Sequence, residues 1–305
     1  MNKRMRRMMW ALCPIAAFAG CTQTKPADAP QWFKGNTHAH SWWSDGDSPP
    51  EIVAAWYKDH GYHFLVISDH NTLQHGEKWV APRRATPDAE QNYERTFGSP
   101  WVVKRQRDGK TEYRLKTADE LRSRFDEPGR FLLIEGDEIS DQADKKPVHL
   151  NGVNLVEAVP PQHGRTVSDA LRNNIDAVLA QRKRTGQPML THINHPNFGW
   201  ALTADDIAPI AHATFVEVYN GHPGVNTYGD AKRVGAERMW DIILTKRLGE
   251  LRLPVVYGVA TDDAHCFTAW ATDKANPGRG WVMVRAPRLS PNDIVLAMER
   301  GDFYS

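Results

Sequence analysis

The sequence predicts a single α/β domain folded as a distorted TIM-like (β/α)7 barrel. Short apolar runs of strand length alternate with helical stretches along the chain. These runs repeatedly end in His, Asp, Glu or Asn, as barrel strands do when functional groups lie at their C-terminal ends. From Trp32 onward no second linker is evident, and about 270 residues is within the range of one α/β barrel. We therefore expect a functional site at the C-terminal ends of the strands.

Five apolar runs are the main strand candidates, and each leads into polar residues. They are residues 64–67 before His70, 131–134 before Glu135 and Glu138, 189–190 before His192 and His195, 215–219 before Asn220, and 255–260 before Asp262, Asp263 and His265. A further strand is expected through the stretch GNTHAH at 35–40.

Helix starts are predicted where a Ser or Thr precedes an acidic residue by three positions, because such a pair can satisfy free N–H groups at a helix start. The pairs are Thr117 with Glu120, Thr166 with Asp169, Thr203 with Asp206, Ser290 with Asp293, and Ser48 with Glu51, the last with Pro at the first helical position. A helix over 169–184 has apolar residues at helical spacing and ends before Gly186, and another is expected at about 236–248.

One polar segment interrupts this alternation. Residues from about 73 to 116 form an insertion that leaves the barrel just after His70, on the expected functional rim. The stretch WVVKRQRDGKTEYRLK within it predicts a β-hairpin that turns at Asp108-Gly109. The insertion is either a lid over the site or a surface addition without a functional role.

Charge and composition exclude several classes of protein. The chain has 38 Lys and Arg against 37 Asp and Glu, so it offers no general basic field for nucleic acid. With 41% hydrophobic residues it is neither disordered nor collagen-like, and it can bury a sizeable core.

The first 21 residues are predicted to be an export signal, because a basic start precedes a short apolar run and small residues. Cleavage after Ala19 fits an A-x-A site, whereas Phe18-Ala19-Gly20-Cys21 resembles the lipobox of bacterial lipoproteins. Lipidation of Cys21 is the favoured interpretation, with 22–31 as a tether. The protein is then exported, faces the periplasm and contacts the outer membrane only through its lipid. Only Cys266 remains in the domain, so no disulfide forms within it.

The stretch GNTHAHSWWSDG is the strongest local signal of chemistry. His38 and His40 are two apart on the predicted strand, so their side chains project from one face. Paired imidazoles suit a divalent metal, and Asp45 can add a carboxylate from the following loop. Five further stretches rich in ligand residues accompany this pair: SDHNT at 68–72, GDEIS at 136–140, VHLNG at 148–152, NHPN at 194–197 and TDDAH at 261–265.

Together these six stretches resemble the polymerase-and-histidinol-phosphatase (PHP) family of metal-dependent hydrolases. The resemblance covers most of residues 32–305, with the motifs in the family's order. GNTHAHSWWSDG is similar to the HxH…SDG opening, SDHN to the second motif and GDEIS to the G-x-E-I-S element. Within the family, residues 34–71 look most similar to the CehA/McbA-like metallohydrolases.

The resemblance implies two or three divalent ions, and the mixed ligands suit Zn²⁺, Mn²⁺ or Fe²⁺ rather than Ca²⁺. It implies that Glu138 bridges two ions, at the separation of roughly 3.5–4 Å that two-metal hydrolases use. The implied ligands are His38, His40 and Asp263 for the first ion, Glu138, Asp45 and His70 for the second, and His149, His195 and His265 for a third. Of these residues, Glu138, Asp263 and His195 are the expected catalytic ones.

Three further residues are candidates for substrate binding. Asn220 and His222 end a strand on the expected rim, and Arg279 in NPGRGW is a candidate anion clamp. His192, three residues before His195, is a candidate supporting residue.

Other polar and aromatic neighbours have competing interpretations. Asp69 and Asp262 adjoin expected ligands and are expected to orient histidines. Glu135 competes with Glu138 as the bridge, but the G-x-E-I-S register favours Glu138. The Trp42–Trp43 pair forms either an apolar wall of the site or ordinary packing.

The expected function is a phosphoesterase in which a metal-bridging hydroxide attacks the phosphorus of a small-molecule phosphate ester. Two alternatives remain open. The first is a carboxyl-ester or carbamate hydrolase on the same metal site. The second is a metal-binding or delivery lipoprotein without catalysis. Such a protein would need only a simple mononuclear site, whereas the implied ligands here are spread over six strand ends.

Overall fold

The computed structural model describes residues 29–81 and 87–305. The predicted signal peptide, its Cys21 and most of the predicted tether lie outside these residues. Within the described ranges, no helix combines the length and the apolar character needed to cross a membrane.

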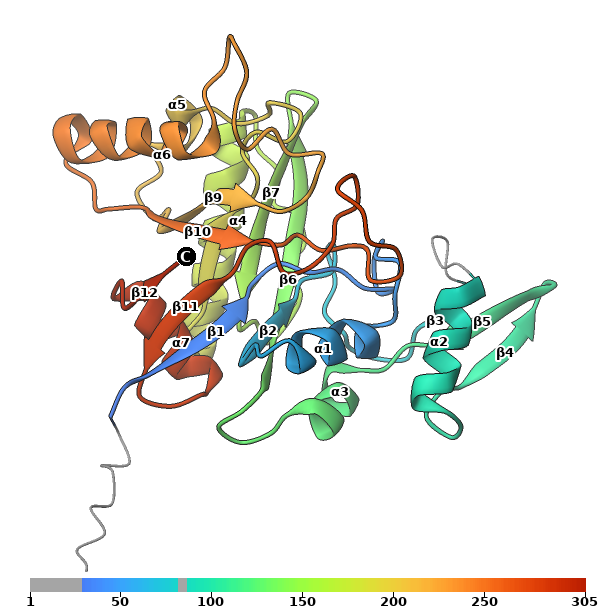
Figure 1. Cartoon of the computed structure of the whole chain (residues 1–305). Helices are drawn as coiled ribbons and strands as arrows, with labels where there is room; N and C mark the ends of the chain where they lie inside the picture. The colour runs from blue at the N-terminus through green and yellow to red at the C-terminus, as the bar shows by residue number, and fades with distance from the viewer. Residues whose placement is uncertain (1–28, 82–86) are drawn as a thin grey trace, which may run out of the picture.

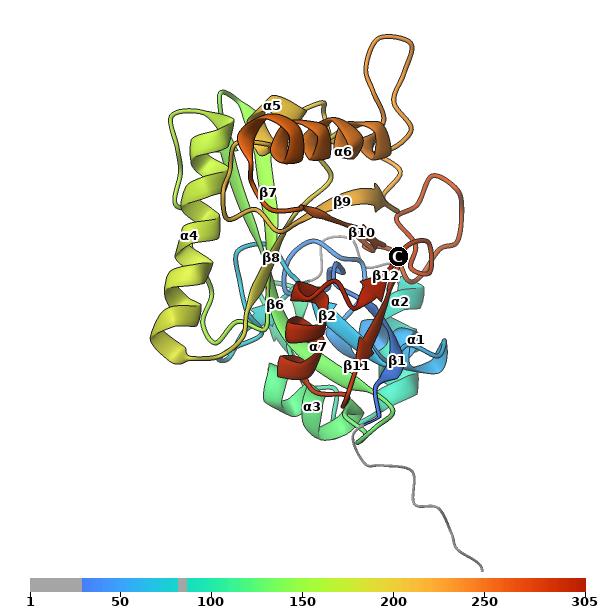
Figure 2. The ribbon, with the colours of Figure 1, turned by 90° about the vertical axis from the view of Figure 1, so that its left-hand side faces the viewer.

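A nine-stranded sheet curls into a nearly closed barrel (Figures 1 and 2). Its order is β10 (Tyr257–Thr261), β9 (Phe215–Asn220), β8 (Leu190–Ile193), β7 (Lys146–Val153), β6 (Leu132–Ala143), β2 (Phe64–Ile67), β1 (Gln31–Asn36), β11 (Val282–Ala286) and β12 (Phe303–Tyr304). The two end strands, β10 and β12, meet at a seam, where Ser305 Oγ donates to the Gly258 carbonyl at 3.4 Å.

The sheet is mixed, which differs from the expected succession of seven parallel strands. Strands β1, β2 and β6 are parallel, and so are β8, β9 and β10. However, β7 is antiparallel to both of its neighbours, and β11 is antiparallel to β1 and β12. The β6–β7 connection explains this, because Asp144 and Lys145 both have positive φ, at 51° and 62°. A two-residue turn of this kind joins antiparallel strands, whereas a parallel pair needs a long crossover.

The helices begin close to where the sequence signals them. They are α1 (Pro50–Asp59), α2 (Pro87–Phe97), α3 (Ala118–Phe125), α4 (Val167–Thr185), α5 (Ala204–Ile207), α6 (Ala236–Leu244), the π-helical segment η1 (Thr245–Leu251) and α7 (Pro291–Glu299). Thr117 and Thr203 form reciprocal capping boxes, while Thr166 and Ser290 accept a hydrogen bond from the third helical N–H.

The predicted capping box at α1 is wrong. Pro49 is the N-cap, and Ser48 Oγ donates to Asp47 instead. The Glu51 carboxylate is buried and accepts hydrogen bonds from Tyr93 and Trp101, so it is not free to cap the helix. Pro50 at the first turn still fixes a helical φ there.

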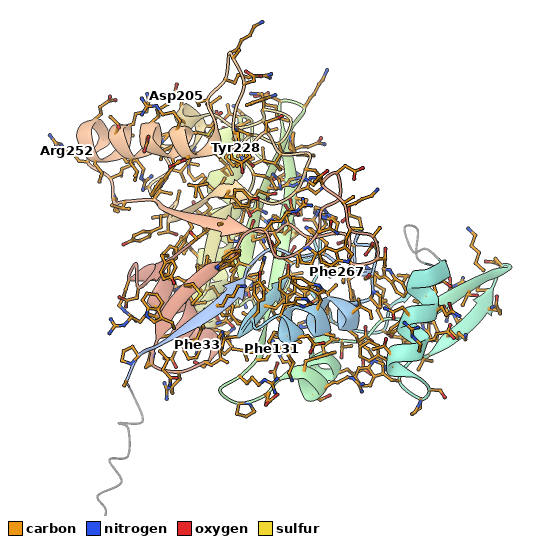
Figure 3. The ribbon with its side chains drawn as sticks, viewed as in Figure 1. Phe33, Phe131, Asp205, Tyr228, Arg252 and Phe267 are labelled. Carbon is orange, nitrogen blue, oxygen red and sulfur yellow. The ribbon has the colours of Figure 1, made fainter. Side chains whose placement is uncertain are left out.

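The core has three parts that hold the strand ends in place. Inside the curled sheet, inward residues of β1, β2 and β6–β11 pack with α7, and Phe33 belongs to this cluster (Figure 3). Outside, α4, α5 and α6 pack against the strands from β6 to β9. A third cluster joins α1 and α3 to β2 and β6, and it includes Phe131 and Phe267. Burial on both faces keeps the strands rigid, so their ends form a fixed frame.

The insertion is a small packed unit that projects beside the barrel (Figure 1). It consists of α2 and a three-stranded sheet in the order β3 (Trp79–Val80), β5 (Lys110–Arg114), β4 (Lys104–Arg107). The predicted hairpin is present, with Asp108 and Gly109 at φ values of 51° and 72°.

Trp42 and Trp43 pack the base of this insertion. Both are 4% exposed and form a cluster with Tyr93, Tyr113 and Leu115. The pair therefore serves packing rather than forming a wall of the expected site.

Candidate metal centre

The predicted ligands come from the strand ends on one rim of the barrel. His70 follows β2, His195 follows β8, and Asp263 and His265 follow β10. Glu138 lies within β6, and His149 lies near the start of β7, which reaches the rim with that end because it runs antiparallel.

His38 and His40 lie beyond the strand on which they were expected, because β1 ends at Asn36. Between them, Ala39 forms an isolated parallel bridge with Ala264, which brings the loop after β1 to the loop after β10. Both imidazoles still point to the same group of carboxylates. Asp45 follows in the next turn.

Glu138 is the centre of the cluster and is 1% exposed. Its two carboxylate oxygens contact five imidazoles. Oε2 lies 2.9 Å from His70 Nδ1, 3.3 Å from His40 Nε2 and 3.4 Å from His38 Nε2, and Oε1 lies 3.1 Å from His195 Nε2 and 3.2 Å from His149 Nδ1. A carboxylate with ligand groups at both oxygens has the arrangement that a bridge between two cations requires.

Asp263 contacts His38 and His40, which also contact Glu138. Its Oδ1 lies 3.3 Å from His38 Nε2 and 3.2 Å from His40 Nε2. Asn220 Nδ2 donates to its Oδ2 at 3.1 Å, which fixes the carboxylate orientation. Asp263 has a φ of 49°, a left-handed conformation uncommon for residues other than glycine.

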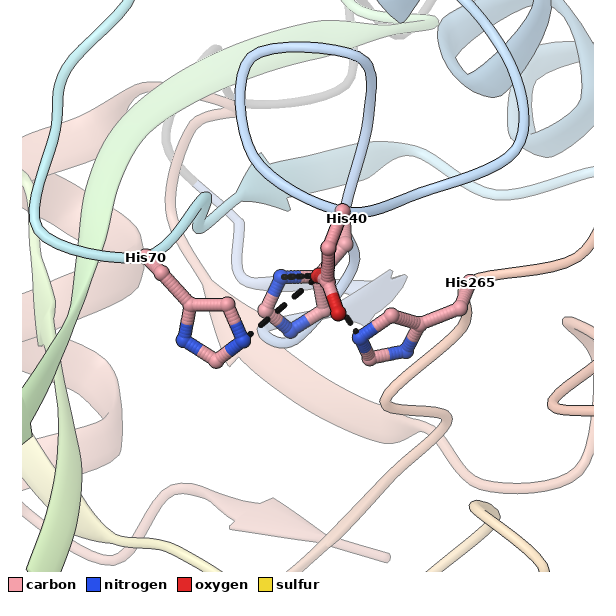
Figure 4. A group of neighbouring side chains, drawn as sticks. His40, His70 and His265 are labelled. Carbon is pink, nitrogen blue, oxygen red and sulfur yellow. Dashed lines mark ion pairs between the residues drawn. The ribbon is translucent and has the colours of Figure 1, made fainter. Parts of the chain in front are cut away.

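Figure 4 shows His40, His70 and His265 close together, and the Asp45 carboxylate contacts all three. Its Oδ1 lies 3.1 Å from His265 Nε2, 3.5 Å from His70 Nε2 and 3.7 Å from His40 Nδ1. The structure thus brings all nine predicted ligands into one connected group.

The electrostatics of the cluster favour cations. Burial would lower the pKa of His38, but Asp263, Glu138 and Glu217 outweigh it and raise that pKa well above its usual value. Burial is likewise outweighed at His70, where Glu138 raises the pKa to about 9. Conversely, the pKa of Glu138 stays well below its usual value despite burial, because His38 and His70 face it. Carboxylates that draw protons onto imidazoles provide the same negative field for divalent ions.

The donor atoms also fit a metal by position. Among the described residues, no hydrogen-bond partner is present for the buried Nε2 atoms of His38 and His40. Four overlapping sets have ligand atoms within 4.8 Å of one another: His40, Asp45, His70 and His265; His38, His40 and Glu138; His38, His195 and Asp263; and His70, Glu138 and His149. Imidazole nitrogen with carboxylate oxygen suits Zn²⁺, Mn²⁺ or Fe²⁺.

Asp69 and Asp262 fix the loops that carry the ligands instead of contacting histidines themselves. Asp69 accepts hydrogen bonds from Ser41, Ser44 and Gln74. Asp262 accepts from Tyr57 Oη and from the backbone N–H groups of 278–280. The expectation for Asp69 is supported through Ser44, whose Oγ donates to Asp69 Oδ1 at 2.6 Å and lies 3.3 Å from His40 Nδ1. For Asp262 the expectation is corrected to an indirect role through the backbone.

Glu135 lies apart from the cluster. Its carboxylate contacts Arg122 at 2.7 Å and His75 at 2.6 Å. The geometry therefore favours Glu138 over Glu135 as the bridging residue.

A cavity of about 250 Å³ gives access to the cluster. It is lined by Asp45, His70, Glu138, His149, His195, Phe198, His222, Asp263 and His265. None of the insertion's described residues, 73–81 and 87–116, belongs to this lining, which favours the surface addition over the lid.

His222 lies in the cavity wall with a defined tautomer. Its Nδ1 accepts the Gly224 N–H at 3.0 Å, so a neutral ring carries its hydrogen on Nε2. Burial lowers the pKa of His222 to about 4, which keeps the ring neutral near pH 7.

Of the other two substrate candidates, Asn220 contacts Asp263 and Arg279 does not reach the cluster. The Arg279 guanidinium donates to the carbonyls of Gly221 and Ala271, at 2.9 Å and 3.0 Å. Its role as an anion clamp stays a prediction.

Two buried residues at the site were missed or weakly signalled in the sequence. Glu217, in the middle of β9, hydrogen-bonds His38 Nδ1 at 2.8 Å. The signal for it was a carboxylate inside the apolar run FVEVY, which cannot be buried without partners. His192 is fully buried beside Glu217, and burial lowers its pKa to about 4, so it is a neutral supporting residue.

No protein-family model matches the chain, and no curated protein matches it significantly. A solved two-domain protein from Bacteroides vulgatus, which contains a predicted PHP-like metal-dependent phosphoesterase, superposes with a TM-score of 0.50 at 16% sequence identity. The match covers 90% of this chain and 65% of that protein, so this chain spans just under two thirds of its length. At this identity the likeness shows a shared fold.

Two further solved structures are more distant. A candidate metal-dependent phosphoesterase from Bifidobacterium adolescentis gives a TM-score of 0.44 at 13% identity, over 81% of this chain and 91% of that one. An amidohydrolase from Chromobacterium violaceum, with bound sulfate and no metal, gives 0.41 at 12% identity, over 76% and 87%. Both fall below a TM-score of 0.5, so the fold comparison rests on the Bacteroides protein.

Proposed function

We propose that this chain is a PHP-type metal-dependent hydrolase and that its substrate is a phosphate ester. The observation that carries the proposal is the buried Glu138 carboxylate, which imidazoles contact at both oxygens. The shared fold with a protein that contains a predicted PHP-like phosphoesterase supports it. The similarity of residues 34–71 supports placement among the CehA/McbA-like members.

The residues divide into those that hold cations and those that face the substrate. Glu138, Asp263 and Asp45 supply negative charge, and the surrounding imidazoles supply neutral nitrogen ligands at neutral pH once protons are displaced. A pair of divalent cations, when bound, generates a nucleophile from water and neutralises charge on the ester oxygens. A cavity of about 250 Å³ admits a small ester rather than a macromolecule.

His222 is the residue of this chain best placed to interact with the ester. It lines the cavity, and the Gly224 N–H at Nδ1 directs its single hydrogen to Nε2. A neutral imidazole of this kind donates a hydrogen bond to an oxygen on which negative charge develops. His192 is fully buried and does not line the cavity, so it does not contact the ester.

The substrate class is tested with apoprotein reconstituted with Mn²⁺, Zn²⁺ or Fe²⁺. We expect turnover of p-nitrophenyl phosphate or bis-p-nitrophenyl phosphate, with at least two ions bound per chain. Turnover of p-nitrophenyl acetate or a carbamate alone would establish the alternative substrate class. Metal binding without turnover of any ester would favour a binding protein, and one ion or fewer per chain would contradict the multinuclear site.

The bridging role is tested with a matched pair of substitutions. Glu138→Gln removes the charge that holds two cations, so kcat should fall by roughly 1,000-fold or more, beyond the 10- to 100-fold typical of supporting residues. Glu135→Gln, three residues away and paired with Arg122 and His75, should retain most activity. If Glu135→Gln were the inactive variant, the motif register would be wrong.

We also propose that the protein is exported and anchored to the outer membrane through lipid on Cys21. The support is the basic start, the apolar run and the lipobox-like ending in the sequence.

A further inference from the structure

Glu217 is a carboxylate buried at the centre of a strand, 1% exposed. Four groups hydrogen-bond to its two oxygens, and His192 Nδ1 lies 3.7 Å from Oε1. Oε1 lies 2.8 Å from His38 Nδ1 and accepts from Thr261 Oγ1 at 2.7 Å, and Oε2 accepts from His195 N at 2.6 Å and from Asn220 Nδ2 at 2.9 Å. Both oxygens are thus occupied, as an ionised acceptor-only carboxylate requires.

The contact with His38 determines the tautomer of that ring. Because an ionised carboxylate only accepts, Nδ1 carries the hydrogen and Nε2 is left to bind a metal. The His38 Nε2 atom lies among the predicted ligands, 3.4 Å from Glu138 Oε2 and 3.3 Å from Asp263 Oδ1. Without Glu217 the ring is free to adopt the other tautomer, in which Nε2 carries the hydrogen and is no longer a ligand.

The same carboxylate reaches two more predicted ligands. It accepts the backbone N–H of His195, whose φ is 25°, an uncommon value for a residue with a side chain. It also accepts from Asn220 Nδ2, which in turn donates to Asp263 Oδ2 at 3.1 Å. One side chain therefore connects His38, His195 and Asp263, which come from three different strand ends.

We propose that Glu217 is a positioning residue that sets the orientation of His38, His195 and Asp263 together, and so determines how tightly the site binds its first metal. The inference deepens the proposed function and rests on the same metal site. Glu217 itself does not line the cavity, so it acts through the ligands and not on the substrate.

Glutamine cannot replace Glu217 at this position. Its side chain has one acceptor oxygen and one NH₂ donor. With the NH₂ at the Oε2 position, this donor faces two other donors, the backbone N–H of His195 and the side-chain NH₂ of Asn220, so no hydrogen bond forms there. In the flipped orientation, the NH₂ faces His38 Nδ1 and drives the ring to the tautomer that cannot bind through Nε2.

The test measures metal binding rather than turnover. Apoprotein of the parent, Glu217→Gln and Glu135→Gln is titrated with Zn²⁺ in a calorimeter, and its thermal unfolding is recorded. We expect Glu217→Gln to bind its first ion 10- to 100-fold more weakly, the range typical for removal of a residue that orients a ligand. Glu135→Gln, the matched control outside the cluster, should bind like the parent.

A spectroscopic readout separates positioning from general loss of structure. In the Zn²⁺-loaded parent, the imidazole ¹⁵N signals of His38 should show hydrogen on Nδ1 and metal at Nε2. In Glu217→Gln the Nε2–metal signature should be lost or mixed. If the variant binds Zn²⁺ within twofold of the parent, or keeps the parent signature, the proposal is overturned.

A second variant keeps the test decisive if Glu217→Gln does not fold. Asn220→Ala leaves the buried charge but removes the link to Asp263, and we expect about 10-fold weaker binding of the first ion. Unchanged affinity in a folded Asn220→Ala protein would refute the link. Ester turnover is assayed separately, so a parent that binds Zn²⁺ but hydrolyses no ester would contradict the proposed function while leaving the positioning role intact.

Discussion

Replacement of Arg247 by Met is expected to destabilise the protein by about 3 kcal/mol, although no predicted ligand is touched. Arg247 lies in η1 and is fully buried. Its guanidinium donates to five backbone carbonyls and pairs with no carboxylate among the described residues. Four of these carbonyls belong to residues 208–213, the segment that leads into β9.

The magnitude follows from which carbonyls lose their donor. Ala208 and Ala213 are each 1% exposed, and Arg247 reaches their oxygens at 3.0 Å and 3.3 Å. A buried acceptor left without its donor costs about 1–3 kcal/mol, so the pair costs about 2–6 kcal/mol. Ile210 O still accepts from Ala213 N, and the carbonyls of exposed Ala211 and Pro254 gain water, so these three add little.

An opposing effect reduces this cost. Burial lowers the pKa of Arg247, which shows that the guanidinium itself is costly to desolvate. Met removes that charge and keeps most of the apolar stem. The hydrogen bonds should nevertheless prevail, because five carbonyl dipoles stabilise one cation here.

Urea unfolding of the metal-free protein measures the effect. With an m-value of about 3 kcal/mol/M, the midpoint should fall by roughly 1 M. Arg238→Met is the matched control, since this arginine is exposed on α6 and its ion pair with Asp241 contributes little. A midpoint for Arg247→Met within about 0.3 M of the parent, or above it, would refute the argument.

Three further outcomes are expected. Glu51→Ala removes the acceptor for the Tyr93 and Trp101 side chains of the insertion. Hydrogen exchange in residues 87–116 should therefore accelerate while Zn²⁺ affinity stays unchanged, and weaker Zn²⁺ binding would contradict this expectation. Burial opposes the shift at Glu120, but Arg114 lowers its pKa to about 2, so its stabilising contribution is present above about pH 4.5 and is lost as the pH falls towards 2. The difference in urea midpoint between the parent and Glu120→Gln should therefore narrow from pH 5 to pH 3, and a constant difference would exclude the pairing as its cause. Cys21→Ser should move the protein from the membrane to the soluble periplasmic fraction with catalysis intact, and unchanged fractionation would favour cleavage after Ala19.

Features that depend only on residues close together in the chain could be predicted from the sequence. Thr117 and Thr203 cap helices as predicted, because a capping box needs only residues that are neighbours in the chain. The clustering of the nine predicted ligands could also be predicted, because residues at the ends of successive strands share one rim.

What could not be predicted depends on contacts between distant segments. The β6–β7 turn uses Asp144 and Lys145 with positive φ and has no glycine to reveal it, so antiparallel β7 was missed. Glu51 follows a capping pattern, but Tyr93 and Trp101 of the insertion engage its carboxylate. Tertiary contacts of this kind override a local pattern without leaving a mark in the surrounding sequence.

The predicted ligands span the chain from His38 to His265, and this spread would link metal binding to folding as a whole. No fragment that lacks either end contains the complete set, so only a fully assembled barrel can bind with full affinity. A cation that binds the folded but not the unfolded chain, at 100 times its Kd, adds about 2.7 kcal/mol to the free energy of unfolding. Metal availability in the compartment where the protein folds would then set its lifetime as well as its activity, and chelation would expose the chain to proteolysis.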